Sequence, residues 1–418
     1  MRVSWLPLLA LATSCSASHG VDDAGTPPVT LDGETHFIPH LEAGPLDASD
    51  GPDVFFPGTC VWSRGLARPI THDVSGGKLL GAVHAGAHEV VLAWSSAVTN
   101  DLYVESLDAD GTVTLDAQRV APTPAAPGLG SLVVTSALRG VLFAATGGCE
   151  LASLSEANVV TATPVPIWSG RCLEAEATSD HSLSIVALSA DGSAGASYED
   201  FDLSSRSPLV QRLVAPSAVE AHRTVRVGGS PGHFLFVARD SSGQVTTQHF
   251  DPQGAPVAEP VVLAPEVGTL RGVGPLEVDE GWLLTTQVQD ESGFHLATVT
   301  LDLDGRPTRE PFVVQTVQSV RGLYYDVARS GDDVIIAWTE WLATDAPRIA
   351  IHTQAFSQDG FPRGAVVDLY EGAAIEDAPD DLALAATARG VVVIFHARMD
   401  PFASPELYAA LLRCVPPT

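Results

Sequence analysis

Short runs of apolar residues recur along the chain at a nearly constant spacing. The runs have five or six residues each and span 90–94, 141–145, 183–188, 234–238, 282–286, 334–338 and 391–395. Each lies between Gly, Asp or Ser turns and is followed by a strand in which polar and apolar residues alternate. The period of about 50 residues is typical of repeats with four strands each. No long stretch has a helical period, so the pattern predicts an all-β chain.

A second signal agrees with this repeat. Similar turns, with Asp or Ser in second place and Gly last, lie at 107–111, 250–254, 301–305 and 356–360. Asp or Ser can bind the turn backbone, and Gly supplies the positive φ that closes the turn. The repeat therefore predicts a β-propeller over 59–418, with seven four-stranded antiparallel blades. Six or eight blades are the alternatives, because the copy around Leu183 is the weakest.

The last copy of the repeat is incomplete. It has strand-like segments at 382–387, 391–397 and 407–413 before Thr418, and an unused strand-like segment at 60–70 precedes the first copy. In a closed ring an N-terminal strand can complete the last blade, which removes an open sheet edge. We therefore expect segment 60–70 to pair with the third strand of the last blade.

Four cysteines follow Cys15, namely Cys60, Cys149, Cys172 and Cys414. In an exported chain an even count favours disulfides over metal binding or catalysis. Of the three possible pairings, the ring model brings the strand ends at Cys60 and Cys414 together. Cys149 is then left to pair with Cys172. The alternative is four free, buried thiols.

The N-terminal residues 1–15, MRVSWLPLLALATSC, have the pattern of an export signal. Arg2 precedes an apolar run that is too short to span a bilayer. The ending at 11–15 resembles the bacterial lipoprotein signal, although Ala12 stands where Leu is usual. That resemblance implies an acylated Cys15 as the first mature residue, and Ser16 after it implies the outer membrane. The alternative is an ordinary cleaved signal.

Segment 16–58 is acidic and contains no Lys or Arg. Such a self-repelling composition predicts a disordered tether between the membrane and the folded domain. A short recognition segment around Phe37 and Ile38 is the alternative.

The charge of the chain narrows the choice of partner. Lys and Arg number 22 against 51 Asp and Glu, which gives a net charge of −29. This charge disfavours nucleic acid and polybasic membrane docking. Lys78 is the single lysine, a sign of a GC-rich genome. Together with the signal, this makes the chain similar to uncharacterised seven-bladed propeller lipoproteins of myxobacteria. We expect a monomer bound to the membrane only through its lipid, at the outer membrane, in the periplasm or at the cell surface.

Three motifs with possible chemistry have simpler structural interpretations. Segment 228–232 matches G-x-S-x-G, but Pro231 has no N–H for an oxyanion and no helix is expected to follow. His84 and His88 flank a predicted hairpin turn without a third metal ligand. The Asp-rich turns lack the further oxygen ligands of a calcium loop. We therefore assign no catalytic residue, metal or cofactor.

One group of residues remains as a candidate binding site. Trp94, Trp338 and Phe395 occupy equivalent strand ends, which indicates packing between blades. Trp341 lies outside this register, in a predicted loop at 339–348 that neighbours another long loop at 396–406. The candidate residues from these two loops are Glu340, Trp341, His396, Arg398 and Asp400. The alternative is a solvated rim without a ligand.

Three functions are compatible with the sequence. The first is a non-catalytic propeller that binds a protein or glycan at the cell envelope. The second is an exported hydrolase or lyase with carboxylates at the mouth of the propeller channel, and the third is a structural envelope protein. A fold alone does not decide between them.

Overall fold

The computed structural model divides the chain into two units, Met1–Pro52 and Asp53–Thr418. The predicted signal, Cys15 and the predicted tether lie outside the described residues, which all belong to the second unit. The structure describes residues 61–70, 78–96, 99, 101–121, 130–134, 139–145, 148–168, 171–179, 182–188, 194–202, 207–213, 222–230, 233–240, 245–251, 255–263, 275–290, 293–317, 323–342, 348–373, 382–397 and 406–415.

The described elements are β-strands, and no helix occurs among them. Accordingly, no described segment could cross a membrane as a helix. The strands form six four-stranded antiparallel sheets and one five-stranded sheet. We call the four-stranded sheets blades 1–6 in chain order, and the five-stranded one the closing sheet. Each sheet has one of the predicted apolar runs in its second strand, which confirms the all-β propeller with antiparallel blades.

The first three blades are built from consecutive strands. Blade 1 contains β3 (Lys78–Ala85), β4 (Glu89–Ser96), β5 (Leu102–Asp108) and β6 (Val113–Ala121). Blade 2 contains β7 (Gly130–Val134), β8 (Arg139–Ala145), β9 (Gly148–Ser153) and β10 (Val165–Trp168). Blade 3 contains β11 (Arg171–Ser179), β12 (Ser182–Leu188), β13 (Ala194–Asp202) and β14 (Ser207–Leu213).

The next three blades repeat this order. Blade 4 contains β15 (His222–Ser230), β16 (His233–Asp240), β17 (Val245–Phe250) and β18 (Val261–Val262). Blade 5 contains β19 (Leu276–Val278), β20 (Gly281–Asp290), β21 (Gly293–Leu301) and β22 (Phe312–Val317). Blade 6 contains β23 (Tyr325–Ser330), β24 (Asp333–Leu342), β25 (Arg348–Ser357) and β26 (Val367–Ala373).

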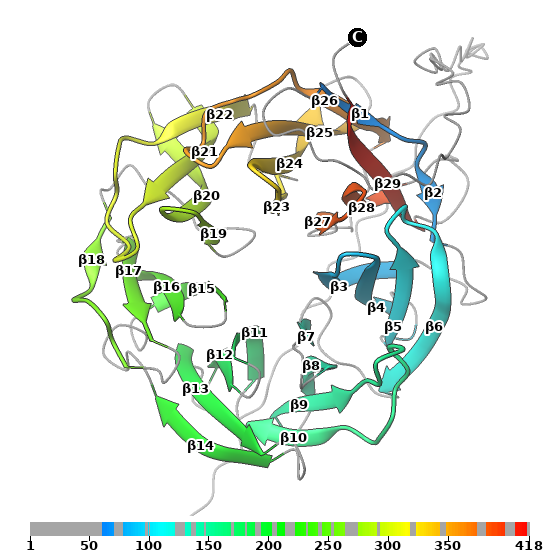
Figure 1. The fold of residues 1–418 in the computed structure, drawn as a ribbon, viewed down its shortest axis with the longest axis vertical. Helices are drawn as coiled ribbons and strands as arrows, with labels where there is room; N and C mark the ends of the chain where they lie inside the picture. Colours follow the sequence, from blue (N-terminus) through cyan, green and yellow to red (C-terminus); the bar gives the residue numbers. More distant parts are fainter. Residues whose placement is uncertain are drawn as a thin grey trace, which may run out of the picture. The chain divides into compact units, whose positions relative to one another are not determined.

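The closing sheet joins the two ends of the folded domain. It contains β27 (Leu382–Thr387), β28 (Gly390–Ala397), β29 (Glu406–Val415), β1 (Val61–Arg64) and β2 (Arg68–Pro69). As predicted, the N-terminal segment pairs with the last strand, with Trp62 opposite Cys414. The innermost strands of the sheets neighbour one another in the cyclic order β3, β7, β11, β15, β19, β23, β27 and back to β3, around the centre of the ring (Figure 1).

The expectation of seven equal four-stranded blades needs correction. Six sheets have four strands, whereas the closing sheet has five, because the N-terminal segment forms two short strands rather than one. Between Arg64 and Arg68 the segment advances four residues while β29 advances three, from Leu412 to Ala409. An extra residue of this kind interrupts a ladder as a β-bulge does.

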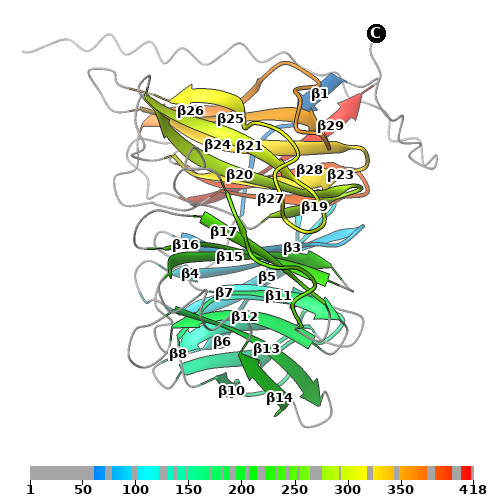
Figure 2. The same cartoon turned by 90° about the vertical axis from the view of Figure 1, so that its left-hand side faces the viewer.

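The second strand of blade 6 has a continuous apolar run at 334–338 because both of its faces are covered there. In blade 6, Ile336 and Trp338 pack against blade 5, whereas Ile335 and Ala337 pack against the closing sheet. Figure 2 shows the blades edge-on, stacked face to face. Trp94 packs in the same way against the closing sheet, as Phe395 does against blade 6. The prediction that these aromatic residues pack between blades is confirmed.

The Asp- and Ser-led turns after the third strands pack onto the preceding blade. Gly111, Gly305 and Gly360 have φ values of 79°, 83° and 72°. In blade 5, the Gly305 carbonyl accepts a hydrogen bond of 2.7 Å from Thr247 of blade 4. In blade 1, Asp110 pairs with Arg389 and Arg413 of the closing sheet, both at 2.7 Å. These turns therefore link each of these two blades to the preceding sheet.

The N-terminal segment contacts more than the strand that it pairs with. Trp62 Nε1 donates to Asp333 Oδ2 of blade 6 at 3.1 Å, and Arg64 donates to two backbone carbonyls of β26. Arg68 donates to Thr112 of blade 1. Segment 61–70 thus ties blade 6, the closing sheet and blade 1 together.

The cysteine pairing predicted from the sequence stays a prediction. Cys149 and Cys414 are both in the disulfide-bonded state. Cys60 lies outside the described residues, and so does the side chain of Cys172. The ladder places Cys414 opposite Trp62, two residues from Cys60.

Candidate functional site

The strands of each blade end at two opposite rims of the ring. In blade 6, β24 begins at Asp333 beside the turns described above and ends at Leu342. We call the end with those turns the turn rim, and the end with Leu342 the loop rim. The residues singled out from the sequence lie at the loop rim.

The structure corrects the expected loop around Trp341. The ladder between β24 and β25 continues to the pair Leu342 and Arg348, so Glu340 and Trp341 lie on a strand. Residues 339–342 contain no Gly or Pro that would end a strand, and residues such as Thr339 and Trp341 favour one, so the hairpin is extended. His396 is likewise on a strand, opposite Leu407. Arg398 and Asp400 lie outside the described residues.

The three described candidates do not share one face. Side chains alternate between the two faces of a strand, so Glu340 lies on the face of Trp338, toward blade 5. Trp341 lies on the opposite face, toward the closing sheet. His396 alternates with Phe395, which faces blade 6, and so lies with Ile394 on the face toward blade 1. The predicted contact between Trp341 and Arg398 stays a prediction.

Glu340 instead belongs to a row of polar side chains across blade 6. His352 on β25 lies between Asp368 on β26 and Glu340 on β24. Its Nδ1 is 2.7 Å from Asp368 Oδ1, and its Nε2 is 3.4 Å from Glu340 Oε2. The Glu340 and His352 side chains are 14% and 17% exposed, whereas Asp368 is 65% exposed. The imidazole also lies 5.6 Å from the Trp338 ring, measured between centroids.

His352 and Asp368 are not among the residues that the sequence pattern predicts for a site. The two lie opposite each other, and His352 is also opposite Trp338. Knowing how β24, β25 and β26 pair would have revealed the row of Glu340, His352 and Asp368. A bulge between Ile351 and His352, however, shifts the pairing of β25 with β26. Alternation alone does not locate such a bulge.

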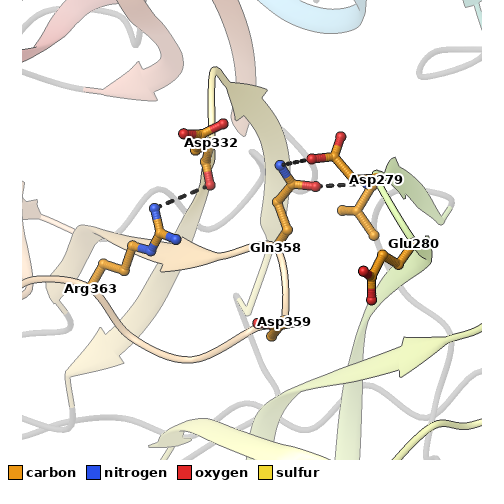
Figure 3. Close-up of a pocket in the computed structure, with 7 residues that line it drawn as sticks. Asp279, Glu280, Asp332, Gln358, Asp359 and Arg363 are labelled. Atoms are coloured by element: carbon orange, nitrogen blue, oxygen red, sulfur yellow. Dashed lines mark hydrogen bonds between the residues drawn. The ribbon is translucent and has the colours of Figure 1, made fainter. Parts of the chain in front are cut away.

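A pocket of about 360 Å³ lies at the turn rim of blades 5 and 6 (Figure 3). It is lined by Val278, Asp279, Glu280, Asp332, Gln358, Asp359 and Arg363. The Gln358 amide donates to Asp279 Oδ2 at 3.0 Å and accepts from the Asp279 backbone N–H at 2.7 Å. Hydrogen bonds from Arg329 and then from Gln358 lower the pKa of Asp279. These groups link the two blades to each other.

The weaker motifs occupy the expected structures. Ser230 of the G-x-S-x-G segment pairs with His233 in the hairpin of β15 and β16, so a strand follows it. His84 is at the end of β3, where burial and the charge of Arg139 lower its pKa, against a smaller raising effect of Glu89. Within the described ranges, no three His, Cys, Asp or Glu side chains are placed to hold a metal.

Comparison with known proteins shows the fold and nothing finer. No family model matches the chain, and no curated protein matches it either. Among solved structures it is similar to phage phi92 endosialidase, with a TM-score of 0.52, 11% identity, and coverage of 84% of this chain and 69% of that one. It is also similar to Kuenenia stuttgartiensis hydrazine synthase, with a TM-score of 0.50, 12% identity, and coverage of 77% and 94%. The chain is a β-propeller, and at such identities the likeness extends to architecture alone.

Proposed function

We propose that this β-propeller is an exported, lipid-anchored protein that binds a protein or glycan at the cell envelope without catalysing a reaction. The observation that carries the proposal is the long hairpin of β24 and β25. Both strands have ten residues, and their ladder continues through Trp341 to the loop rim. The hairpin thus presents the half-buried Trp341 ring at one rim of a rigid scaffold.

The chemistry of the hairpin fits recognition of a polar partner. Trp341 is half-buried, unlike the fully buried Trp94, Trp282 and Trp338. A half-buried Trp offers a large apolar face, and such residues are enriched at binding surfaces. Asp368 on the neighbouring strand β26, whose side chain is 65% exposed, adds an acceptor for the hydroxyl or amide groups of a partner.

Ring closure also fits the proposed anchor. The chain enters the folded unit at β1, on the edge of the closing sheet, after a segment that the sequence predicts to be a tether. We propose that Cys15 carries lipid and that the closing sheet is the seventh blade of the ring. We also propose the disulfides Cys60–Cys414 and Cys149–Cys172. The cyclic order of the innermost strands supports a ring of seven blades.

Envelope binding can be tested with immobilised envelope glycans and detergent-solubilised envelope proteins of the host. We expect Trp341→Ala to weaken binding at least tenfold, because it removes the aromatic face. Leu303→Ala is the matched control, since Leu303 is 48% exposed in a turn at the opposite rim. Equal binding by the two variants would contradict the proposed surface.

The anchor has a separate test. Fractionation of host cells should find the unaltered protein in the membrane fraction and Cys15→Ala in the soluble fraction. Two acyl chains or more give stable anchoring, whereas one chain gives only marginal binding. If the unaltered protein is already soluble, the lipid anchor is wrong while the binding surface stands.

A further inference from the structure

His352 lies between two carboxylates, and the distances fix the position of its first proton. Asp368 is largely exposed, and a carboxylate oxygen accepts hydrogen bonds. Its Oδ1 is 2.7 Å from His352 Nδ1, a hydrogen-bond distance at which the carboxylate accepts. The imidazole Nδ1 must therefore carry hydrogen and donate it.

The second ring nitrogen then has two very different states. A neutral imidazole has one N–H, so with hydrogen on Nδ1 the other nitrogen is an acceptor. Nε2 is buried, has no hydrogen-bond partner in the structure, and faces Glu340 Oε2 at 3.4 Å. In the neutral ring two acceptors thus face each other. A proton on Nε2 converts this contact into a charge-assisted hydrogen bond.

The charged groups near Glu340 and His352 bind elsewhere, so a proton on His352 Nε2 is the charge that joins these two side chains. On the same face of blade 6, Arg348 is paired with Glu371 at 2.9 Å. Arg64 of the closing sheet donates to the backbone carbonyls of Asp368 and Leu369 rather than to either carboxylate. Blade 5 faces this side of blade 6 with apolar residues, among them Leu283, Leu296 and Phe312. Of the ion pairs among described residues, the one that includes Glu340 is with His352.

We propose that His352 is a proton-operated latch on the binding hairpin. When the imidazole is protonated, it bonds to Glu340 and to Asp368 and ties β24, β25 and β26 together. When it is neutral, the bond to Glu340 is absent and the end of the hairpin that carries Trp341 loosens. The inference rests on the proposed function, because it makes the binding surface more ordered in mild acid.

Hydrogen exchange of the full chain tests the latch without any partner. We expect the protection of amides in 333–357, corrected for intrinsic exchange, to fall at least fivefold between pH 5 and pH 8, the range over which histidines titrate. Glu340→Gln should keep its protection across this range, because the new amide can donate to neutral Nε2. The matched control is His295→Gln, which should behave like the unaltered protein. His295 contacts Thr316 and lies on the face of blade 5 turned away from blade 6.

Two results would overturn the latch. One is protection of 333–357 that does not change with pH in the unaltered protein, and the other is the same fall in Glu340→Gln. Should Glu340→Gln fail to fold, side-chain ¹⁵N spectra of the unaltered protein decide instead. They should show two N–H groups on His352 at pH 5 and one at pH 8, and an unchanged ring would contradict the proposal. Because no partner is used, failure of the latch leaves the binding function standing.

Discussion

Asn158 occupies a backbone position that glycine fills in other blades. Its φ is 60°, and its N–H donates to the Ser155 carbonyl at 2.9 Å, as Gly305 N–H donates to Asp302. Asn is among the few residues that tolerate this conformation. Its side chain also donates to Glu89 of blade 1 at 2.9 Å. Segment 154–158 is therefore a copy of the turn that a search for glycine misses.

A substitution at Gly305 tests the importance of these turns. A Cβ there would lie 2.7 Å from Thr247 Oγ1, and φ is 83°. We expect Gly305→Ala to lower the free energy of unfolding by about 1–3 kcal/mol in urea titrations. Gly364→Ala is the control, since its Cβ would meet nothing within 4 Å. Equal stability of the two variants would show that the turns do not fix the blades.

The buried Asp326 makes a second prediction at this scale. It accepts backbone hydrogen bonds from Val327 at 2.8 Å and from Leu384 of the closing sheet at 2.5 Å. Burial raises its pKa to about 7, against the lowering effect of these two bonds. The folded state therefore holds a proton that the unfolded state releases near pH 4. This contribution to stability is full below pH 4 and is lost as the pH rises through 7.

Thermal unfolding between pH 4 and pH 8 measures this effect. The unaltered protein should lose stability relative to Asp326→Asn as the pH rises, by a few kcal/mol at most, since each pKa unit corresponds to about 1.4 kcal/mol. Asp332→Asn, at an exposed position in the next turn, should follow the unaltered protein. If stability changes with pH in the same way in all three proteins, a titrating Asp326 is ruled out.

At the scale of elements, the two tryptophans of β24 should behave differently. Trp338 is 1% exposed and packs against blade 5, whereas Trp341 is half-buried at the end of the hairpin. We expect Trp338→Ala to cost about 3–5 kcal/mol of unfolding free energy, as for a buried aromatic. Trp341→Ala should cost clearly less in the same urea titration. Equal losses would mean that Trp341 is a packing residue and not part of a binding surface.

The sequence predicted the elements of the fold better than those of the site. Apolar runs such as 334–338 identify a strand covered on both faces, because only such a strand lacks alternation. The arrangement of the site depends on the strand face of single residues and on strand register. Glu340 and Trp341 are adjacent on one strand and therefore face different blades, and one bulge places His352 opposite Asp368. Neighbouring residues in sequence thus lie on opposite sides of a blade, which loop positions alone do not predict.

At the scale of the whole molecule, closure of the propeller ring should depend on the N-terminal segment 61–70. Segment 61–70 contacts blade 6, the closing sheet and blade 1, and Ile70 is fully buried. Deleting 59–70 should expose the edge of β29 and cause aggregation in light scattering, whereas deleting 16–50 should change little. Non-reducing peptide mapping should recover Cys60 joined to Cys414. Recovery of Cys60 joined to Cys149 or Cys172 would contradict this closure.

The most direct test of the central claim is photo-crosslinking in the cell envelope. A photoreactive amino acid at position 341 should form an adduct of discrete mass in host cells, because we place this position on the binding surface. The same amino acid at position 303, at the opposite rim, should form none. Adducts at 341 but not at 303 are the result that the account predicts. No adduct at either position, or equal adducts at both, would contradict an envelope-binding propeller that works through this hairpin.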